Sequence, residues 1–256
     1  MSSTPFDRHR ARRHVGLVIE KLVREGTVVS RSDNITHTLA PRAVPGRLGR
    51  ALRDLVMSER AARTIEIGLG YGVSTLFLCQ GLLLSGVSHP GHVAVDPFQT
   101  TGFSDCGLQC LDDAGCRDMV QHYSEESQIV LPRLVAEGRT FDLAFVDGNH
   151  RFDRVFLDLI YLGRLVRPGG IVCVDDHQYP AIAWAVSFCL TNLGWTMETV
   201  SEADDTHQWA VLRTSAVPDE RTFDYFVAFG PAHSSSPSHD HRGTAMASGT
   251  IDPDGE

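Results

Sequence analysis

Short apolar segments rich in β-forming residues alternate with helix-like segments between residues 61 and 177 of this 256-residue chain. Segments of this kind are typical of strands that are buried on both faces of a parallel sheet. Apolar residues spaced for one helix face lie between them, most clearly over residues 152–166. The alternation predicts a parallel sheet with helices on both faces. Strands are expected at residues 64–67, 92–96, 119–123, 141–147 and 170–176.

The end of the chain breaks this alternation. Residues 195–200 and 208–213 both have strand character, and only seven residues separate them. That connection is too short for a crossover helix, so the pair is expected to form an antiparallel hairpin. The predicted fold class is therefore α/β, with a doubly wound, seven-stranded, mostly parallel sheet that ends in an antiparallel C-terminal hairpin. The Arg-Pro-Gly-Gly sequence at residues 167–170 is expected to form the turn between the helix at 152–166 and the next strand.

Three regions follow from the pattern. Residues 1–60 are helical in character and loop-rich, with no strand pattern, and we expect a helical lid or oligomerisation segment there. Residues 61–229 form the main α/β domain. Residues 230–256 are rich in Ser, His, Pro and Gly, and they hold too few apolar side chains to offset the entropy of ordering, so a disordered tail is expected.

Composition and charge exclude several classes of protein. No apolar run approaches the roughly 18 residues that a membrane span needs. No apolar segment of signal length follows the N-terminus, so a cytoplasmic location is expected. The net charge is −9, although residues 1–63 carry 13 basic and 6 acidic side chains. We interpret this basic segment as a solvated, arginine-rich helix and expect neither a nucleic-acid partner nor a membrane partner.

A glycine-rich sequence follows the first predicted strand of the main domain. It reads Glu-Ile-Gly-Leu-Gly-Tyr-Gly-Val-Ser over residues 66–74, with glycines at Gly68, Gly70 and Gly72. Such glycines allow a sharp turn and a close approach of the backbone to a ligand, and the next helix offers free N–H groups at its start. The second strand ends in Asp96, where an acid can accept hydrogen bonds from a ribose diol. Together these features predict a nucleoside-bearing cofactor.

The spacing of the glycines favours one cofactor over another. A dinucleotide-binding loop has the pattern G-x-G-x-x-G, whereas this loop is G-x-G-x-G with Glu66 two residues before its first glycine. A carboxylate there would repel a pyrophosphate but attract the ammonium and sulfonium groups of S-adenosylmethionine. The residues therefore favour S-adenosylmethionine over NAD.

With these motifs, the chain resembles class I S-adenosylmethionine-dependent methyltransferases over about residues 60–213. The segment from Glu66 to Gly72 is similar to the first motif of that family, and Asp96 is similar to its second. The resemblance implies that Ser127, next to Glu126, lies beside the adenine. It further implies a seven-stranded sheet and a cofactor site formed by these residues: Glu66, Gly68, Gly70, Tyr71, Gly72, Ser74, Asp96, Glu126, Ser127 and Asp147.

Acidic residues follow the predicted fourth and fifth strands, at Asp147 and at Asp175 and Asp176. These strands are neighbours in the resembled fold, so their carboxyl ends face one crevice. Three carboxylates in a crevice repel one another unless a cation joins them, and Mg²⁺ prefers oxygen ligands. Metal-dependent O-methyltransferases of the catechol-type and sugar-modifying groups hold Mg²⁺ at the matching positions. Asp147 could instead contact only the cofactor, and Asp175 could cap the following helix.

Two histidines are candidates for the general base. In the catechol-type enzymes a lysine stands three residues after the first metal-binding acid, and here that position is His150. A near-neutral imidazole can take a proton from a hydroxyl group. His177, at the end of the next strand, is the second candidate.

The sequence thus predicts Mg²⁺-assisted O-methylation of a hydroxyl group on a small molecule such as a secondary metabolite, a sugar or a phenol. A metal-independent N-methyltransferase and a non-catalytic nucleoside-binding module are the alternatives. The apolar, arginine-studded N-terminal segment could also pack across a homo-oligomer interface.

Overall fold

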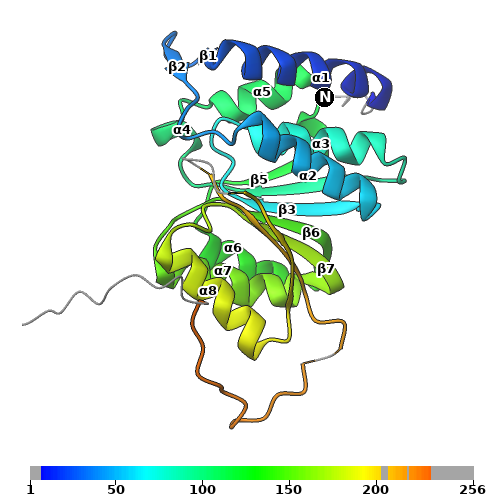
Figure 1. Cartoon of the computed structure of the whole chain (residues 1–256). Coiled ribbons are helices and arrows are strands. Elements are labelled where there is room, and N and C mark those ends of the chain that lie inside the picture. The colour runs from blue at the N-terminus through cyan, green and yellow to red at the C-terminus, as the bar shows by residue number, and fades with distance from the viewer. Residues whose placement is uncertain (1–6, 203–206, 218, 232–256) are drawn as a thin grey trace, which may run out of the picture.

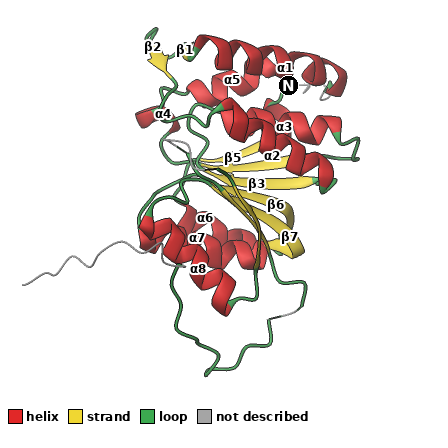
Figure 2. Cartoon of the chain, in the orientation of Figure 1, coloured by secondary structure: helices red, strands yellow, loops and turns green. Residues whose placement is uncertain are grey.

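The computed structural model describes residues 7–202, 207–217 and 219–231. A central sheet lies between two layers of helices, as Figures 1 and 2 show. Its strands are β3 (Arg63–Ile67), β4 (Gly91–Val95), β5 (Val120–Tyr123), β6 (Phe141–Val146), β7 (Val166–Val174), β8 (Thr196–Val200) and β9 (Ala210–Arg213). The helices are α1 (Arg8–Glu25), α2 (Gly46–Ser58), α3 (Val73–Leu84), α4 (Gln99–Gly102), α5 (Cys106–Ala114), α6 (Ser127–Ala136), α7 (Phe152–Leu165) and α8 (Pro180–Asn192), with a 3₁₀ turn at Arg117–Met119.

The strand order is β5-β4-β3-β6-β7-β9-β8. The first five of these strands are parallel, and β9 pairs antiparallel with both β7 and β8. The chain reverses direction between β8 and β9 because their connection has no room for a crossover helix. The predicted fold class, including the antiparallel C-terminal hairpin, is confirmed.

Both faces of the sheet are buried, as the apolar strands require. Alternate residues of β6 belong to different cores: Leu143 and Phe145 pack with α1, α2, α3 and α5, whereas Ala144 and Val146 pack with α6, α7 and α8. Figure 1 shows these helix layers on opposite faces of the sheet. Because successive side chains of a strand point to opposite faces, a continuous apolar run packs against the helices on both faces of the sheet.

Two details differ from the sequence-based expectation. The N-terminal region contains a short antiparallel pair, β1 (Thr27–Val29) and β2 (Thr36–Thr38), although no strand pattern was expected there. Strands of three residues are too short to establish a period of two. The Arg-Pro-Gly-Gly sequence lies within β7 rather than in a turn before it: Phe141 pairs with Val166 and Leu143 with Ile171, so the extra residues form an irregularity in the strand.

The N-terminal segment packs over the carboxyl ends of the parallel strands. The Ser30 hydroxyl donates to the Ser104 carbonyl at 3.0 Å, and the Arg31 amide donates to Gln109 Oε1 at 2.7 Å. Arg47, in the first turn of α2, donates to the backbone carbonyl of His207 at 2.5 Å. These bonds join the segment to the connection after β4 and to the chain before β9. The disordered tail predicted for residues 230–256 lies almost wholly outside the described residues.

Among the described residues, none of the helices combines the length and the apolar character that crossing a lipid bilayer requires.

Candidate functional site

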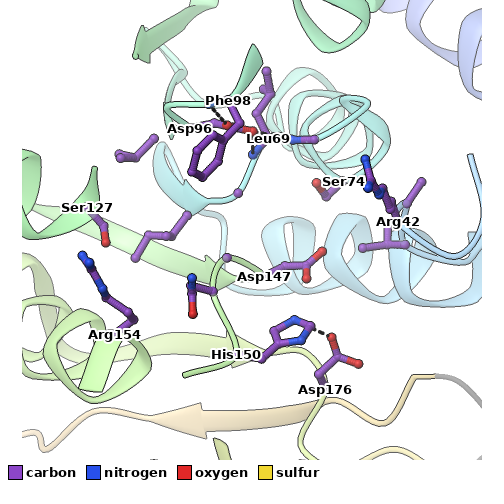
Figure 3. A pocket seen from close by; sticks show the side chains of 18 of the residues that line it. Arg42, Leu69, Ser74, Asp96, Phe98, Ser127, Asp147, His150, Arg154 and Asp176 are labelled. Atoms are coloured by element: carbon purple, nitrogen blue, oxygen red, sulfur yellow. Dashed lines mark hydrogen bonds and ion pairs between the residues drawn. The ribbon is translucent and has the colours of Figure 1, made fainter. Parts of the chain in front are cut away.

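A cavity of about 740 Å³ opens at the carboxyl ends of β3, β4, β6 and β7. In open α/β sheets ligands bind at this edge, where the strand order changes direction. Figure 3 shows the side chains that project into it. The lining residues are 41–44, 67–71, 95–98, 126–128 and 147–150, together with Val73, Ser74, Phe103, Arg154, Asp158, Asp176, Gln178, Tyr179 and His207.

The loop between β3 and α3 forms one wall of the cavity. Gly68 has a φ of +96°, and a Cβ atom built there would lie 2.0 Å from the carbonyl oxygen of Asp147. Only glycine therefore permits the loop to approach the end of β6 this closely. The approach brings the predicted cofactor loop and the predicted acidic group into one cavity.

Asp96 holds the same loop in place. Its Oδ2 atom accepts hydrogen bonds from the backbone amides of Leu69 at 3.1 Å and Gly70 at 2.8 Å, and Oδ1 accepts one from the Phe98 amide at 2.7 Å. A carboxylate oxygen can accept more than one hydrogen bond, so Oδ1 retains capacity for a ligand hydroxyl. Asp96 thus lies where the sequence predicts a ribose-binding acid, with an additional role in shaping the loop.

Glu66 does not line the cavity, contrary to the expectation that it would face the cationic end of the cofactor. It is completely buried, and its carboxylate accepts hydrogen bonds from the Ser74 hydroxyl at 3.0 Å and from the Thr75 hydroxyl. His92 Nε2 lies 3.2 Å away in the same buried group. The Glu66 carboxylate therefore fastens the first turn of α3 to the sheet. Gly72 also lies outside the lining, whereas Gly70, Tyr71 and Ser74 are part of it.

Acidic and imidazole groups gather at the ends of β6 and β7. Asp147, His150 and Asp176 each offer a ligand atom, and these atoms lie within 4.8 Å of one another. His150 Nε2 is 2.9 Å from Asp176 Oδ2, as the dashed line in Figure 3 marks. Burial raises the pKa of Asp147 well above its usual range, and the negative charges of Asp175 and Asp176 raise it further. The hydrogen bond to Asp176 raises the pKa of His150. This end of the cavity therefore favours a positive charge.

Asp175 does not line the cavity itself. It is 1% exposed, and its Oδ2 atom lies 3.0 Å from Nδ1 of His207, which lines the cavity. Asp175, Asp176 and His207 form a second group of ligand atoms within 4.8 Å, so Asp176 is common to both groups. The hydrogen bond that the His207 imidazole donates to Asp175 raises the pKa of His207.

His177, the second histidine that the sequence proposed as a base, does not line the cavity. Its backbone amide donates to the Gln208 carbonyl at 2.7 Å, and burial lowers the pKa of its imidazole. Of these two neighbours, only Asp176 lines the cavity.

The donor set is suited to a divalent cation. Asp147 and Asp176 present carboxylate oxygens, which hard cations prefer, and His150 adds an imidazole nitrogen. The Oδ1 atom of Asp175 is buried without a hydrogen-bond partner among the described residues, as a position awaiting a cation would be. Asp176 has a φ of +56°, a backbone conformation that side chains other than glycine rarely adopt and that is concentrated at functional sites.

The opposite end of the cavity lies between α6 and α7. Figure 3 shows Ser127 and Arg154 there, far from Ser74 and Arg42. Glu126 precedes α6 and accepts a hydrogen bond from Arg154 Nη1 at 2.8 Å. Asp158, one helical turn after Arg154, is 2% exposed, and burial raises its pKa to about 7, partly offset by Ser127 and Arg154.

The buried carboxyl of Asp158 makes a pH-dependent contribution to stability. Because its pKa is about 7 in the folded protein and 3.8 for a free aspartate side chain, its contribution to folding stability is fully present below pH 4 and is lost as the pH rises through about 7. We expect Asp158→Asn to raise the free energy of unfolding of the unliganded protein at pH 8 by about 2 kcal/mol. Denaturant unfolding of both proteins at pH 4 and pH 8 measures the difference, which should disappear at pH 4. Equal differences at the two pH values would contradict this assignment.

Several lining residues carried no signal that the sequence analysis used. Tyr179 stacks on the His150 ring at a centroid distance of 5.3 Å, and Phe103 contacts Tyr71 edge-on at 5.1 Å. Phe98, 54% exposed, follows Asp96 and offers an aromatic face to the cavity. Arg42 comes from the N-terminal segment. These residues lie in connections, whose course depends on tertiary contacts rather than on periodicity.

The central part of the chain resembles known proteins in sequence. Residues 65–177 match a family described as a methyltransferase domain. A caffeoyl-CoA O-methyltransferase of Populus kitakamiensis is 28% identical over 141 residues, which is 54% of this chain and 57% of that protein. A protein of Mycobacterium sp. (strain JLS) assigned to the O-methyltransferases is 28% identical over 162 residues, 60% of this chain and 66% of its own length. The matched part thus spans less than two thirds of either relative.

Solved structures share the fold. An O-methyltransferase of Bacillus cereus in complex with SAH superposes with a TM-score of 0.61 at 17% identity, over 78% of this chain and 91% of that one. The O-methyltransferase TomG of Streptomyces achromogenes, involved in tomaymycin synthesis and bound to SAM, gives a TM-score of 0.57 at 20% identity, over 84% and 93% of the two chains. At these identities the likeness establishes the fold.

Proposed function

We propose that this protein transfers the methyl group of S-adenosylmethionine (SAM) to a hydroxyl group of a small molecule, with a divalent cation such as Mg²⁺ in the site, because residues 65–177 match a methyltransferase domain and the fold is shared with an O-methyltransferase bound to SAH. The observation that carries the proposal is the contact between Gly68 and the Asp147 carbonyl. It places the cofactor loop directly beside the acidic end of one cavity, so that a bound methyl donor and a bound acceptor would meet.

The cofactor is expected to extend along the cavity. Asp96 would bind the ribose hydroxyls through Oδ1, and Ser127 would lie beside the adenine. The free N–H groups at the start of α3, next to Ser74, suit the carboxylate of the methionine moiety. The sulfonium would then lie near Asp147, where burial and neighbouring acids favour a positive charge.

Asp147, Asp175 and Asp176 would hold the cation, which leaves His150 free for another role. When bound, the cation would supply Lewis-acid chemistry that lowers the pKa of the acceptor hydroxyl. Asp147 orients that hydroxyl toward the methyl group from the wall nearest the glycine loop. Much of the rate enhancement would come from this positioning.

His150 is the proposed general base. Its Nε2 atom faces Asp176 Oδ2 at 2.9 Å, so in the Nε2-protonated tautomer Nδ1 carries the lone pair that takes the hydroxyl proton. The Asp176 carboxylate would stabilise the imidazolium that results, and the Tyr179 ring restrains the imidazole from one side. Asp176 therefore positions the base.

The size of the cavity supports a small acceptor. A volume of about 740 Å³ lies within the range of roughly 300–1,000 Å³ that is usual for small-molecule sites, and SAM would occupy much of it. Arg42, Phe103 and Tyr179 also line the cavity, and Tyr179 stacks on His150. Their mixture of aromatic and basic groups favours a phenol or another hydroxylated small molecule, and we propose no nucleic-acid substrate. The segment 1–60 is the proposed lid.

A transfer assay tests the proposal. The full chain would be incubated with SAM labelled in its methyl group, Mg²⁺ and a panel of catechols, phenols, sugars and amines. We expect label in a hydroxyl-bearing acceptor, and a loss of at least tenfold in rate when EDTA replaces Mg²⁺. Full activity in EDTA would contradict the metal site, and transfer to amines alone would identify an N-methyltransferase. Binding of S-adenosylhomocysteine (SAH) without transfer to any acceptor would indicate a non-catalytic nucleoside-binding module.

A further inference from the structure

An unsatisfied carboxylate oxygen lies in the cavity wall, away from the acidic end. Asp158 is 2% exposed, and its Oδ1 atom has no hydrogen-bond partner among the residues that the structure describes. Of the buried carboxylates in the described part of the chain, only Asp175 shares this property, and Asp175 belongs to the acidic group already discussed. A buried acceptor without a donor is unfavourable, so this atom is suited to receive a hydrogen bond from a ligand.

Asp158 lies in the part of the cavity that the nucleobase would occupy. It lines the cavity together with Ser127, Gln128 and Arg154, between the start of α6 and the first turns of α7. In Figure 3, Ser127 and Arg154 stand at one end, Ser74 and Arg42 at the other, and Asp96 and Asp147 between them. If Asp96 binds the ribose and the methionine moiety extends toward Ser74, the adenine must extend toward α6 and α7.

We propose that Asp158 recognises the adenine of the cofactor, with Oδ1 accepting a hydrogen bond from the exocyclic 6-amino group. The inference rests on the proposed function, because it requires SAM or SAH in this cavity. It assigns Asp158 the role of a specificity-determining residue, which selects 6-aminopurine over 6-oxopurine nucleosides. A 6-oxo group would place an acceptor against the carboxylate, and two acceptors cannot share a hydrogen bond.

The raised pKa of Asp158 is compatible with this role. Burial raises it to about 7, so in the empty cavity the carboxyl is partly protonated near neutral pH. A donor from the ligand favours the ionised form, and binding of an amino-purine therefore removes a proton from the protein. At pH 8 the side chain is mainly ionised, and an ionised carboxylate can only accept hydrogen bonds.

Isothermal titration calorimetry at pH 8 tests the inference with two ligands that differ only at position 6 of the purine: SAH and its deaminated analogue S-inosylhomocysteine. The wild-type protein should bind SAH at least tenfold more tightly. In Asp158→Asn the amide can donate to the 6-oxo group, so the preference for SAH should fall at least tenfold. Asp153→Asn, an exposed acid on the same helix, is the control and should keep the wild-type ratio.

The ratio of the two affinities separates recognition from a structural role. If Asp158→Asn weakened the binding of both ligands by the same factor, the role of Asp158 would be only to support the start of α6. The inference would then be wrong. A wild-type protein that binds the two ligands equally would also overturn it, while leaving the proposed function intact. A wild-type protein that binds neither ligand would overturn the proposed function and this inference together. Denaturant unfolding of each variant confirms that it is folded during the titrations.

Discussion

Replacement of Asp147 with alanine is expected to lower kcat/KM for methyl transfer on the order of 10³-fold without destabilising the protein. Asp147 stands at the junction of the cofactor loop and the acidic group, where it would both hold the cation and face the sulfonium. In the unliganded protein, burial and the charges of Asp175 and Asp176 oppose its ionisation, which is why its pKa is raised. Removing the carboxylate relieves this repulsion, so the melting temperature at pH 7 should not fall.

The measurement pairs steady-state kinetics, with the best acceptor from the panel, with thermal unfolding at pH 7. Asp153→Ala is the matched control, because Asp153 is an exposed acid whose ion pairs within the described part of the chain are with Arg151 and Arg154. It should retain wild-type kinetics. An Asp147→Ala protein with more than a tenth of the wild-type kcat/KM would show that the acidic end does not take part in transfer.

Replacement of Gly68 with alanine should weaken SAH binding at least a hundredfold and cost about 3 kcal/mol of folding stability. The added Cβ would meet the Asp147 carbonyl oxygen at 2.0 Å, and the φ of +96° is unfavourable for alanine. The obstructing atom belongs to the backbone, so no rotation of a side chain can relieve the contact. Either the loop or the end of β6 must move, and both form the cavity.

Gly86→Ala is the control for the backbone conformation alone. Gly86 also has a positive φ, +74°, but nothing lies within 4 Å of a Cβ atom built there. This variant should lose about 1 kcal/mol of stability and bind SAH like the wild type. Calorimetric titration with SAH and denaturant unfolding distinguish the two variants. If Gly68→Ala and Gly86→Ala bound SAH equally well, the close approach of Gly68 to the Asp147 carbonyl would not be needed for binding, and the prediction would be wrong.

The fold could be predicted because buried parallel strands have a strong local signal. Each predicted strand of the main sheet overlaps an observed strand, with ends that differ by a few residues, and the short connection before β9 determined the antiparallel hairpin. The resemblance to class I methyltransferases, which rested on the glycine loop and Asp96, is confirmed by the family match and by the fold. Residues in short strands, such as β1 and β2, have no comparable period.

The position of Glu66 could not be inferred from its distance to the glycines. In β3 the side chains alternate, so Ile65 and Ile67 pack toward α6 to α8 while Glu66 points beneath α3. Because side chains alternate along a strand, Glu66 could have been assigned to the sheet face opposite Ile65 and Ile67, where it is covered by α3. Glu66 is thus absent from the cavity lining, whereas Asp147, also predicted to contact the cofactor, is part of it.

Two other residues left signals that could have been used. His207 precedes β9, and an antiparallel strand beside β7 must begin where β7 ends, so His207 returns to the neighbourhood of Asp175. Asp158 is an acid on the buried face of α7, next to Leu159, where an apolar residue would be expected. By contrast, nothing in the sequence indicated that Arg42 would reach the cavity, because its position depends on how the N-terminal segment packs.

The bond between Arg47 and the His207 carbonyl joins residues 160 positions apart, and His207 lines the cavity. The wall that His207 contributes is therefore complete only after the last strand has been synthesised and inserted between β7 and β8. The glycine loop and the acidic residues after β6 and β7 come earlier in the chain, and the sheet that carries them depends on its apolar layers for folding.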